Sequence, residues 1–463
     1  MRRLLPGLVA LGLCLPTALG AEARKADLVV RHGTVVTVDK ERRVIPDGAL
    51  AVLGGRIVAV DTQAAVARDF VARETLDAEG GLVIPGLVNA HTHAAMVLFR
   101  GIADDLKLMD WLQRYIFPAE ARNVTPEFVR EGTRLAALEM IRSGTTTFVD
   151  MYYFEDEVAE VTREAGLRGV LGETVIDMPA PDHKTPAEAL ASAEGFLGRF
   201  RDDPRIVPAL APHSAYLCSP ETLRRVREVA GKFRAPILIH LSETQAEQDT
   251  IRERYGKTPT EHLKELGLLR KGLLGAHGVW LTETDRATLK ASGAGIAHCP
   301  ESNMKLASGA APVAAMLREG LPLGLGTDGA ASNNDLDMFE EMLAAALLAK
   351  HVTGDPTAAP AHAVLEMATL GGARALGLED QIGSLEPGKR ADIVIMGLGE
   401  PRLHPLYDPV SHLVYAAKGA DVRDVVVEGK VIMRDRRVLT LDEGKILATA
   451  DRVRDRVSAT LRP

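Results

Sequence analysis

Histidines and carboxylates recur in this sequence directly after short apolar runs. His91 and His93 follow one run with a single residue between them, His240 and His277 end two others, and Asp328 follows a fourth. The two imidazoles of an extended His-x-His pair point to the same side, because strand side chains alternate with a period of two. Three neutral imidazoles and one carboxylate suit Zn²⁺ or Fe²⁺, with one position left for water. A single His-x-His pair, or a lone buried histidine, is weak support for a metal site. Four apolar runs that all end in such residues together favour a metal site.

The runs that carry these residues alternate with helical stretches. Periodicity predicts helices over residues such as 127–142, 219–233 and 338–350. Short strands rich in Val, Ile and Leu that alternate with helices are typical of βα units around a parallel sheet. Strands are predicted over residues 82–93, 145–151, 168–175, 206–213, 236–243, 273–279, 295–300 and 322–328. Eight βα units predict a (β/α)8 TIM-type barrel, in which the polar strand ends meet at one face.

The two chain ends have a different pattern of apolar and polar residues. Alternating strands separated by Gly and Asp turns occupy residues 27–61, and the pattern returns after Gly383 in 391–396 and 422–429. We therefore expect an α/β protein in which a small β-sandwich is built from both chain ends. The predicted divisions are a signal peptide at 1–20, the first part of the sandwich at 21–82, the metal-dependent barrel at 83–380, and the second part of the sandwich with a C-terminal tail at 381–463.

The first twenty residues have the three-part layout of a secretory signal. Arg2-Arg3 precede an apolar run that reaches Leu19, and small residues follow before Ala21. The alternative is a short buried helix, because the run is too short to span a bilayer core of about 30 Å. The signal predicts a periplasmic or secreted protein with no membrane anchor after its removal.

Composition restricts the partner. Hydrophobic residues at 46% and charged residues at 25% are ordinary for a globular protein and exclude a disordered or collagen-like chain. A net charge of −8 without long charge runs argues against nucleic acid and leaves a small molecule as the expected ligand. Three cysteines cannot form a disulfide framework. A homodimer is the default expectation for the oligomeric state.

Four segments together resemble hallmarks of the amidohydrolase superfamily, and the resemblance covers nearly the whole chain after the signal. They are residues 85–93, 240–243, 326–329 and 387–394. The resemblance implies one divalent metal held by His91, His93, His240 and Asp328. Zinc is the expected ion, with iron and manganese as alternatives. Binuclear members usually carry a carboxylated lysine at the end of strand four, where this chain reads Ala211-Pro212-His213, which favours a single metal.

Within the superfamily, the chain looks most like the methylthioadenosine/S-adenosylhomocysteine deaminases and their guanine deaminase and triazine hydrolase neighbours. Trp111 and residues 117–120, 213–218 and 299–306 carry this likeness. It implies that Glu120 meets ribose hydroxyls or their equivalent and that His213 meets a ring nitrogen of the base. Trp111 is expected at the substrate, or else as a packing residue in a loop.

One position departs from the family pattern. Glu173 stands where these deaminases often place an arginine aimed at the amino-acid carboxylate of the substrate. We expect Glu173 either to contact substrate or to cap the following loop. A glutamate would repel a carboxylate, so the tail of the substrate is expected to be neutral or cationic.

The resemblance implies hydrolytic deamination of an aminated N-heterocycle, either an adenosine-type nucleoside or a related purine, pterin or triazine. Metal-bound hydroxide would attack the ring, with Asp328 as general base, Glu243 as proton donor to a ring nitrogen and His277 polarising the water or holding it in line. The alternative is an exported amidohydrolase that cleaves another C–N bond, amide or cyclic, or a C–halide or C–S bond. A non-catalytic binding protein is disfavoured, because the ligands and the acid–base residues are all present.

Overall fold

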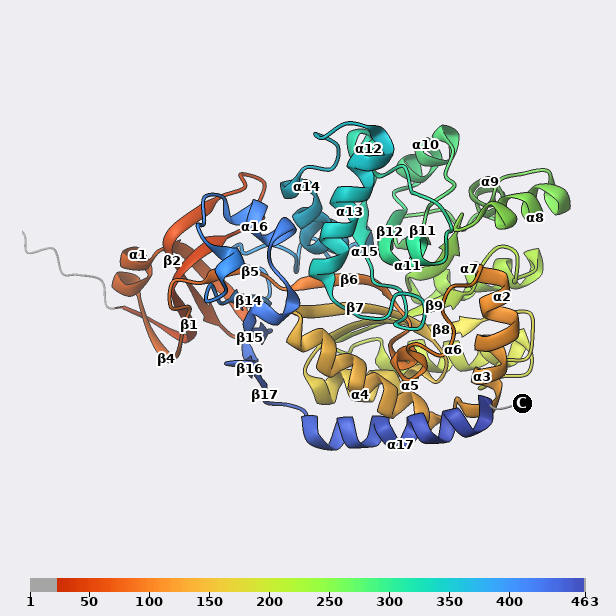
Figure 1. Cartoon of the computed structure of the whole chain (residues 1–463), viewed down its shortest axis with the longest axis horizontal. Helices are drawn as coiled ribbons and strands as arrows, with labels where there is room; N and C mark the ends of the chain where they lie inside the picture. The colour runs from red at the N-terminus through yellow and green to blue at the C-terminus, as the bar shows by residue number, and fades with distance from the viewer. Residues whose placement is uncertain (1–22, 462–463) are drawn as a thin grey trace, which may run out of the picture.

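The structure is a computed structural model that describes residues 23–461. The predicted signal peptide at 1–20 therefore lies outside the described residues. Figure 1 shows a barrel flanked by helices and, beside it, a smaller domain whose sheet is built from strands of both terminal parts of the chain. None of the helices within residues 23–461 is long and apolar enough to cross a membrane.

The barrel is a parallel sheet whose strands follow one another in chain order. Its members are β6 (Leu87–Thr92), β7 (Thr145–Tyr152), β8 (Arg168–Val175), β9 (Ile206–Pro212), β10 (Ile237–Leu241), β11 (Leu273–His277), β12 (Gly295–His298) and β13 (Leu323–Leu325). The amide of Asp328 donates to the carbonyl of His91 at 2.9 Å, which joins the end of the last strand to the first. All residues of β7 and β8 are buried, as expected for strands covered on both faces. The predicted TIM-type barrel is confirmed.

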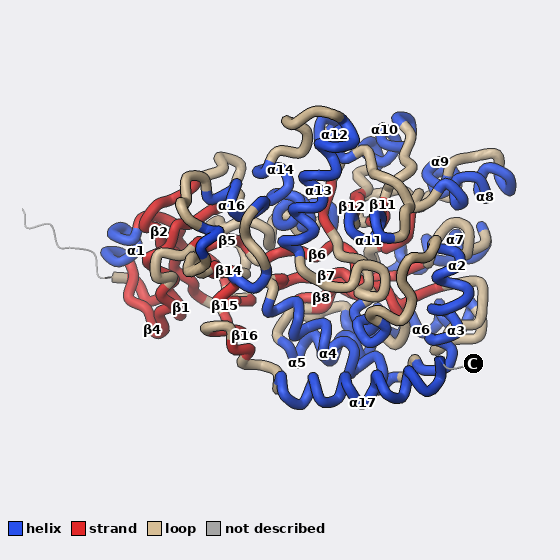
Figure 2. The backbone as a smooth tube through the Cα atoms, viewed as in Figure 1, coloured by secondary structure: helices blue, strands red, loops and turns tan. Residues whose placement is uncertain are grey.

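Helices follow the barrel strands and cover the outside of the sheet (Figure 2). They are α4 (Pro126–Arg142), α5 (Glu155–Ala165), α6 (Pro186–Phe200), α7 (Pro220–Phe233), α8 (Gln245–Tyr255), α9 (Pro259–Glu265), α10 (Glu283–Ser292), α11 (Pro300–Lys305), α12 (Val313–Glu319), α13 (Met338–Thr353), α14 (Ala361–Glu366), the π-helix η3 (Met367–Gly371) and α15 (Gly372–Leu376). Many begin at a Ser or Thr whose side chain accepts an amide of the first turn, as Thr185 does for α6 and Ser219 for α7. Such caps satisfy amides that the helix itself leaves free.

A helical segment between β6 and β7 supplies part of the substrate cavity. It consists of η1 (Ala94–Phe99), α2 (Leu108–Trp111), the π-helix η2 (Leu112–Ile116) and α3 (Phe117–Asn123). A π-helical turn inside an α-helix is uncommon and is often found at functional sites.

The second sheet joins the two chain ends. It contains β1 (Arg24–Val36), β2 (Val44–Leu53), β3 (Arg56–Thr62), β4 (Phe70–Asp77), β5 (Leu82–Pro85), β14 (Ile393–Met396), β15 (Val422–Val427), β16 (Lys430–Arg434) and β17 (Arg437–Val438). β5 pairs antiparallel with β14 and parallel with β1. The helical pieces of this part are α1 (Gln63–Asp69), η4 (Pro401–Leu403), α16 (Pro409–Tyr415) and η5 (Gly419–Asp421). The expected small β-sandwich from both chain ends is therefore present.

The first predicted barrel strand, residues 82–93, is in fact two strands. It divides at Gly86, whose amide donates to the carbonyl of Asp392 at 2.9 Å. A Cβ at position 86 would lie 2.1 Å from the hydroxyl oxygen of Thr146, so only glycine fits where the chain passes from the small sheet into the barrel.

The C-terminal segment, expected as a tail, ends in a long helix. α17 (Glu443–Leu461) packs along the barrel helices α3 and α4 (Figure 1). Its buried residues Ile446, Val453 and Val457 lie on one face. At its end, the carbonyl of Thr460 accepts a hydrogen bond from Arg122 at 2.7 Å.

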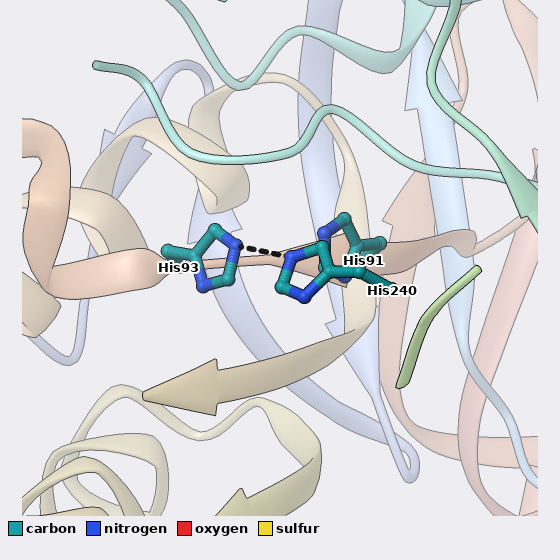
Figure 3. Close-up of side chains that lie close together, drawn as sticks. All are labelled: His91, His93 and His240. Atoms are coloured by element: carbon teal, nitrogen blue, oxygen red, sulfur yellow. Dashed lines mark hydrogen bonds between the residues drawn. The ribbon is translucent and has the colours of Figure 1, made fainter. Parts of the chain in front are cut away.

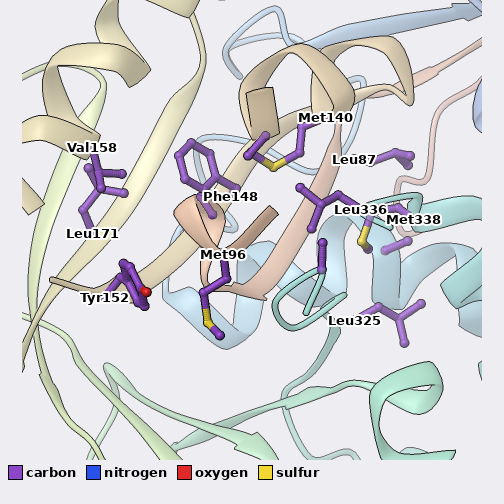
Figure 4. Close-up of a cluster of buried hydrophobic side chains, with 14 of the residues drawn as sticks. Leu87, Met96, Met140, Phe148, Tyr152, Val158, Leu171, Leu325, Leu336 and Met338 are labelled. Carbon is purple, nitrogen blue, oxygen red and sulfur yellow. The ribbon is translucent and has the colours of Figure 1, made fainter. Parts of the chain in front are cut away.

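The main hydrophobic core lies between the barrel strands and their covering helices. Figure 4 shows side chains from β6, β7, β8 and α4 that pack together there, among them Phe148, Met140 and Leu171. Met96 and Tyr152 belong to the same core cluster and also line the substrate cavity. The core is therefore continuous with the wall of the site.

Candidate active site

Four side chains from three parts of the chain converge at the carboxyl end of the barrel. His91 and His93 lie at the end of β6, His240 lies in β10, and Asp328 follows β13. The Nε2 atoms of His93 and His240 are 3.3 Å apart (Figure 3). Asp328 Oδ1 lies 3.3 Å from His93 Nε2 and 3.4 Å from His91 Nε2.

This donor set fits a divalent metal ion. Four ligands bound tetrahedrally at about 2.0–2.1 Å lie about 3.3–3.4 Å from one another, which are the separations measured here. His91 Nε2 is buried and has no hydrogen-bond partner within residues 23–461. A buried nitrogen is seldom left without a partner, so a cation at the common centre accounts for its orientation.

Backbone carbonyls orient two of the histidines. His93 Nδ1 lies 2.7 Å from the carbonyl of Met151, and His240 Nδ1 lies 2.9 Å from that of His213. A carbonyl only accepts, so each Nδ1 carries the proton and each Nε2 presents its lone pair to the centre.

Asp328 is held from behind by two hydroxyl groups. Its Oδ2 accepts hydrogen bonds from Ser302 at 2.7 Å and from Ser332 at 2.9 Å. These bonds leave Oδ1 directed at the histidines. The backbone of Asp328 has a φ of 61°, a left-handed conformation that costs energy outside glycine and often occurs at functional sites.

His277 and Glu243 lie beside the four donors. His277 Nε2 is 3.8 Å from Glu243 Oε2, and its Nδ1 is 3.0 Å from the side-chain oxygen of Asn303. Burial raises the pKa of Glu243, against the opposing charge of His277. The backbone amide of Glu243 donates to Glu247 at 2.8 Å, so the first turn of α8 holds this carboxyl group in place. A buried acid of raised pKa next to an imidazole can donate and recover a proton.

The site favours positive charge at its centre. Burial alone would lower the pKa of His93, but the hydrogen bond and charge of Asp328 outweigh it and raise that pKa to about 9. Burial lowers the pKa of His91 to about 4. The carboxylate of Asp328 therefore stabilises positive charge at the centre of the site.

The cavity above the donors has a volume of about 630 Å³, including its open mouth. Trp111, Glu120 and His213 all line it, and Trp111 is buried there as the last residue of the helix α2 rather than in a loop. Glu120 accepts a hydrogen bond from the Tyr152 hydroxyl at 2.7 Å, and burial raises its pKa to about 7. Burial lowers the pKa of His213 to about 3, so this imidazole is neutral.

Glu173 lies elsewhere. Thr174 is the β8 residue that lines the cavity, and Glu173 lies on the other side of the strand because strand side chains alternate. Its Oε2 accepts the amide of Glu155 at 3.2 Å, at the start of α5. Glu173 therefore accepts an amide at the start of the preceding helix α5 rather than one in the following loop, where the capping role was expected, and it is not among the residues that line the cavity.

Sequence reasoning missed several residues that hold the site together. Ser302 and Asn303 lie in segment 299–306, which was noted for its family likeness without a role for either side chain. Tyr152 pairs with a glutamate 32 positions earlier in the chain, and no local pattern indicates that contact. Glu247 carried a weak signal, as the Glu three residues after the helix cap Thr244.

The amidohydrolase family matches residues 82–432, and the chain belongs to this family. With this fold and its deaminase-named relatives, it is a hydrolase that acts on C–N bonds.

The chain is similar to named relatives over nearly its whole length. It is 50% identical over 439 residues, 95% of this chain and 99% of the relative, to a 5-methylthioadenosine/S-adenosylhomocysteine deaminase of Syntrophobacter fumaroxidans. It is 44% identical, over 94% of this chain and 99% of the relative, to a 5′-deoxyadenosine deaminase of Methanosarcina mazei. The crystal structure of a zinc-bound adenosine deaminase from Xanthomonas campestris is 42% identical and superposes with a TM-score of 0.93, covering 95% of this chain and all of that one.

Proposed function

We propose that this protein is a zinc-dependent deaminase of adenosine-type nucleosides, which replaces the ring amino group by oxygen and releases ammonia. The observation that carries the proposal is the cavity lined by His93, His240, Asp328 and Glu243, with His91 beside the first three. The names of the relatives, all adenosine-type deaminases, support the substrate class.

The bound cation would supply a nucleophile by lowering the pKa of water to about 7. Asp328 accepts the proton of the attacking water, because its Oδ1 faces the centre while Ser302 and Ser332 hold Oδ2. Glu243 protonates the neighbouring ring nitrogen, then takes the proton of the hydroxyl group added to the ring and passes it to the departing amine. The proton held by Asp328 afterwards restores Glu243. His277 directs the water, with its Nδ1 anchored on Asn303. The C–N bond breaks as the C–O bond is completed, and ammonia leaves.

Two further residues recognise the nucleoside in this proposal. Neutral His213 has a buried Nδ1 without a hydrogen-bond partner in the described part of the chain, and it would meet a ring nitrogen of the base. Glu120 accepts hydrogen bonds from ribose hydroxyls, with Tyr152 holding one oxygen of its carboxyl group.

The substituent on the ribose would enter a second hollow, the tail hollow, which shares Phe117, Glu120 and Tyr153 with the cavity. Its other walls are mostly apolar, including Met178 and Pro179. Of the residues that line it, Lys184 alone is basic, and the Lys184 ammonium is turned to the carbonyl of Ala180. A short uncharged tail therefore suits this hollow better than an amino-acid carboxylate, which would lose its hydration without gaining a bidentate arginine.

The test is a substrate panel with the chain lacking residues 1–20, in zinc-loaded and metal-free forms. Ammonia release is measured from adenosine, 5′-methylthioadenosine, 5′-deoxyadenosine, S-adenosylhomocysteine, guanine and an aminated triazine. We expect zinc-dependent release from the adenosines, with S-adenosylhomocysteine at least about 10-fold lower in kcat/KM, equivalent to about 1.4 kcal/mol. No ammonia from any of these compounds would contradict the proposal and favour cleavage of a different bond.

We further propose that residues 1–20 export the protein, because their charge and hydropathy follow the secretory pattern. Fractionation of cells that express the full chain should place activity outside the cytoplasm, with a shortened N-terminus by mass spectrometry. Full-length protein retained in the cytoplasm would contradict it.

A further inference from the structure

A second group of buried donor side chains lies behind the cavity wall, on the side of β8 that faces α5. Glu173 belongs to β8, and Asp182 and His183 follow in the loop before α6. One donor atom from each of these three residues lies within 4.8 Å of the other two. The reaction described above uses none of them.

The spacing of these donors resembles that of ligands around one ion. His183 Nδ1 lies 3.1 Å from Asp182 Oδ1 and 3.8 Å from Glu173 Oε1. Donors bound to one cation at 2.0–2.2 Å lie about 3.0–3.6 Å apart, so the separation from Asp182 falls within that range and the separation from Glu173 is slightly longer. The side chains of Glu173 and Asp182 are 4% and 3% exposed, whereas that of His183 is 18% exposed. His183 therefore marks the side from which an ion and its waters enter.

Backbone amides hold both carboxylates so that their second oxygens face His183. Asp182 Oδ2 accepts the amide of Phe154 at 3.3 Å, and Glu173 Oε2 accepts that of Glu155 at 3.2 Å. Within residues 23–461, Asp182 Oδ1 and His183 Nδ1 are buried and, although they lie 3.1 Å from each other, neither forms a hydrogen bond. Buried polar atoms are nearly always paired, so these two indicate a ligand that completes their bonding.

The local charge also calls for a cation. Asp150 and Glu155 are buried next to Glu173, and in the described chain none of the four carboxyl groups, Asp182 included, pairs with a lysine or arginine. Buried carboxylates persist only with bound protons or a cation.

We propose that Glu173, Asp182 and His183 form a second metal site, separate from the catalytic one, for a divalent transition-metal ion of the Zn²⁺ or Mn²⁺ class. One imidazole with two carboxylates suits such ions, with water completing the shell. An ion there would tie β8 to the loop before α6, which carries part of the tail hollow. Its role is structural, because these side chains do not reach the substrate.

The test is metal binding by the folded chain without residues 1–20, freed of metal and titrated with Co²⁺ by calorimetry and visible absorption. The wild type should bind two ions. His183→Gln and Glu173→Gln should each retain one, with the lost site weakened at least about 10-fold. His240→Ala should keep the second site while losing the catalytic one. Asp156→Asn is the matched control, since it removes a nearby carboxylate that is half exposed and pairs with Arg199.

Several outcomes would overturn the second site. One is a single binding event in the wild type that His240→Ala abolishes. Another is two events that survive in both His183→Gln and Glu173→Gln. Circular dichroism and thermal unfolding establish whether each variant is folded. If the cluster variants do not fold, the numbers of ions bound by the wild type and by His240→Ala decide whether the second site exists. In either of these two cases, protons shared among the buried carboxyl groups, and not a metal ion, balance the negative charge of the cluster.

Discussion

Glu243 is the acid–base group of the proposed reaction, because its surroundings keep its carboxyl group protonated to a higher pH than that of an exposed glutamate. Burial raises its pKa, His277 lies 3.8 Å away, and Glu247 anchors its backbone. The carboxyl group is thus poised to give a proton to the ring and recover it from the water.

Glu243→Gln should reduce kcat by about 10²- to 10⁴-fold, the usual contribution of a general acid–base group. Metal content should stay unchanged, because Glu243 is not among the four converging donors. Steady-state kinetics and elemental analysis measure the two effects. Glu253→Gln, an exposed change on the helix α8 that follows Glu243, is the control, and an active Glu243→Gln enzyme would refute the assignment.

Glu120 predicts a pH dependence of substrate binding. Burial raises its pKa to about 7, so its carboxylate, the better acceptor for ribose hydroxyls, forms as the pH rises through about 7. KM for adenosine should therefore fall from pH 6 to pH 8, and Glu120→Gln should flatten this profile. A 2′,3′-dideoxy substrate, which lacks both hydroxyls, serves as the control. A profile identical in wild type and Glu120→Gln would rule out this role.

At the scale of elements, the short helix α11 positions two catalytic groups at once. Its neighbouring residues Ser302 and Asn303 bond to Asp328 and His277 respectively. Lys305, at the end of the helix, pairs with Asp104 in the loop that leads to α2. This helix of six residues therefore contacts His277 of β11, Asp328 after β13 and the loop before α2.

Separate variants should distinguish the two contacts of α11. Ser302→Ala should weaken metal affinity by about 10- to 100-fold, the usual effect of removing a partner of a ligand. Asn303→Ala should lower kcat with little change in metal affinity, because His277 is not one of the four converging donors. Competition with a chelator and steady-state kinetics measure these effects. Met304→Ala, exposed on the same helix, should do neither; equal effects of all three variants would indicate general loosening of α11.

At the scale of the whole molecule, a buried ion pair joins the two domains. Arg168 of β8 and Asp392, which precedes β14, lie 3.1 Å apart, and their side chains are 4% and 3% exposed. Asp392 also accepts the amide of Glu428 at 2.8 Å. The buried carboxylate of Asp392, in the domain of the small sheet, is therefore balanced by an arginine of the barrel.

Asp392→Ala should lower the free energy of unfolding by about 3–5 kcal/mol, because it leaves Arg168 charged and buried without its partner. The double change Arg168→Met with Asp392→Leu should recover much of this loss. Asp455→Ala breaks an exposed pair with Arg454 and should cost less than about 1 kcal/mol. Chemical denaturation measures all three; equal losses in the single and double variants would contradict the charge argument.

The resemblance to the amidohydrolase superfamily singled out His91, His93, His240 and Asp328 as ligands. The sequence patterns by themselves were sufficient for the barrel, the small sheet from both ends, and the meeting of histidines and a carboxylate at one barrel face. Each depends on local periodicity, or on the rule that parallel strands present their carboxyl ends at one face. α17 was missed because its partners, α3 and α4, lie some three hundred positions earlier in the chain. The division at Gly86 was missed although Pro85-Gly86 is a turn signal, because apolar residues continue on both sides of that pair.

Only the tertiary structure decided what stands behind the site. The contacts of Ser302, Asn303 and Tyr152 join positions far apart in sequence, and Glu173 could be assigned to the outer side of β8 only once the facing of each strand residue was known. Residue types and their spacing determine which chemistry this chain can perform. Distances between atoms of separate segments, which no local pattern encodes, determine which side chains hold that chemistry in place.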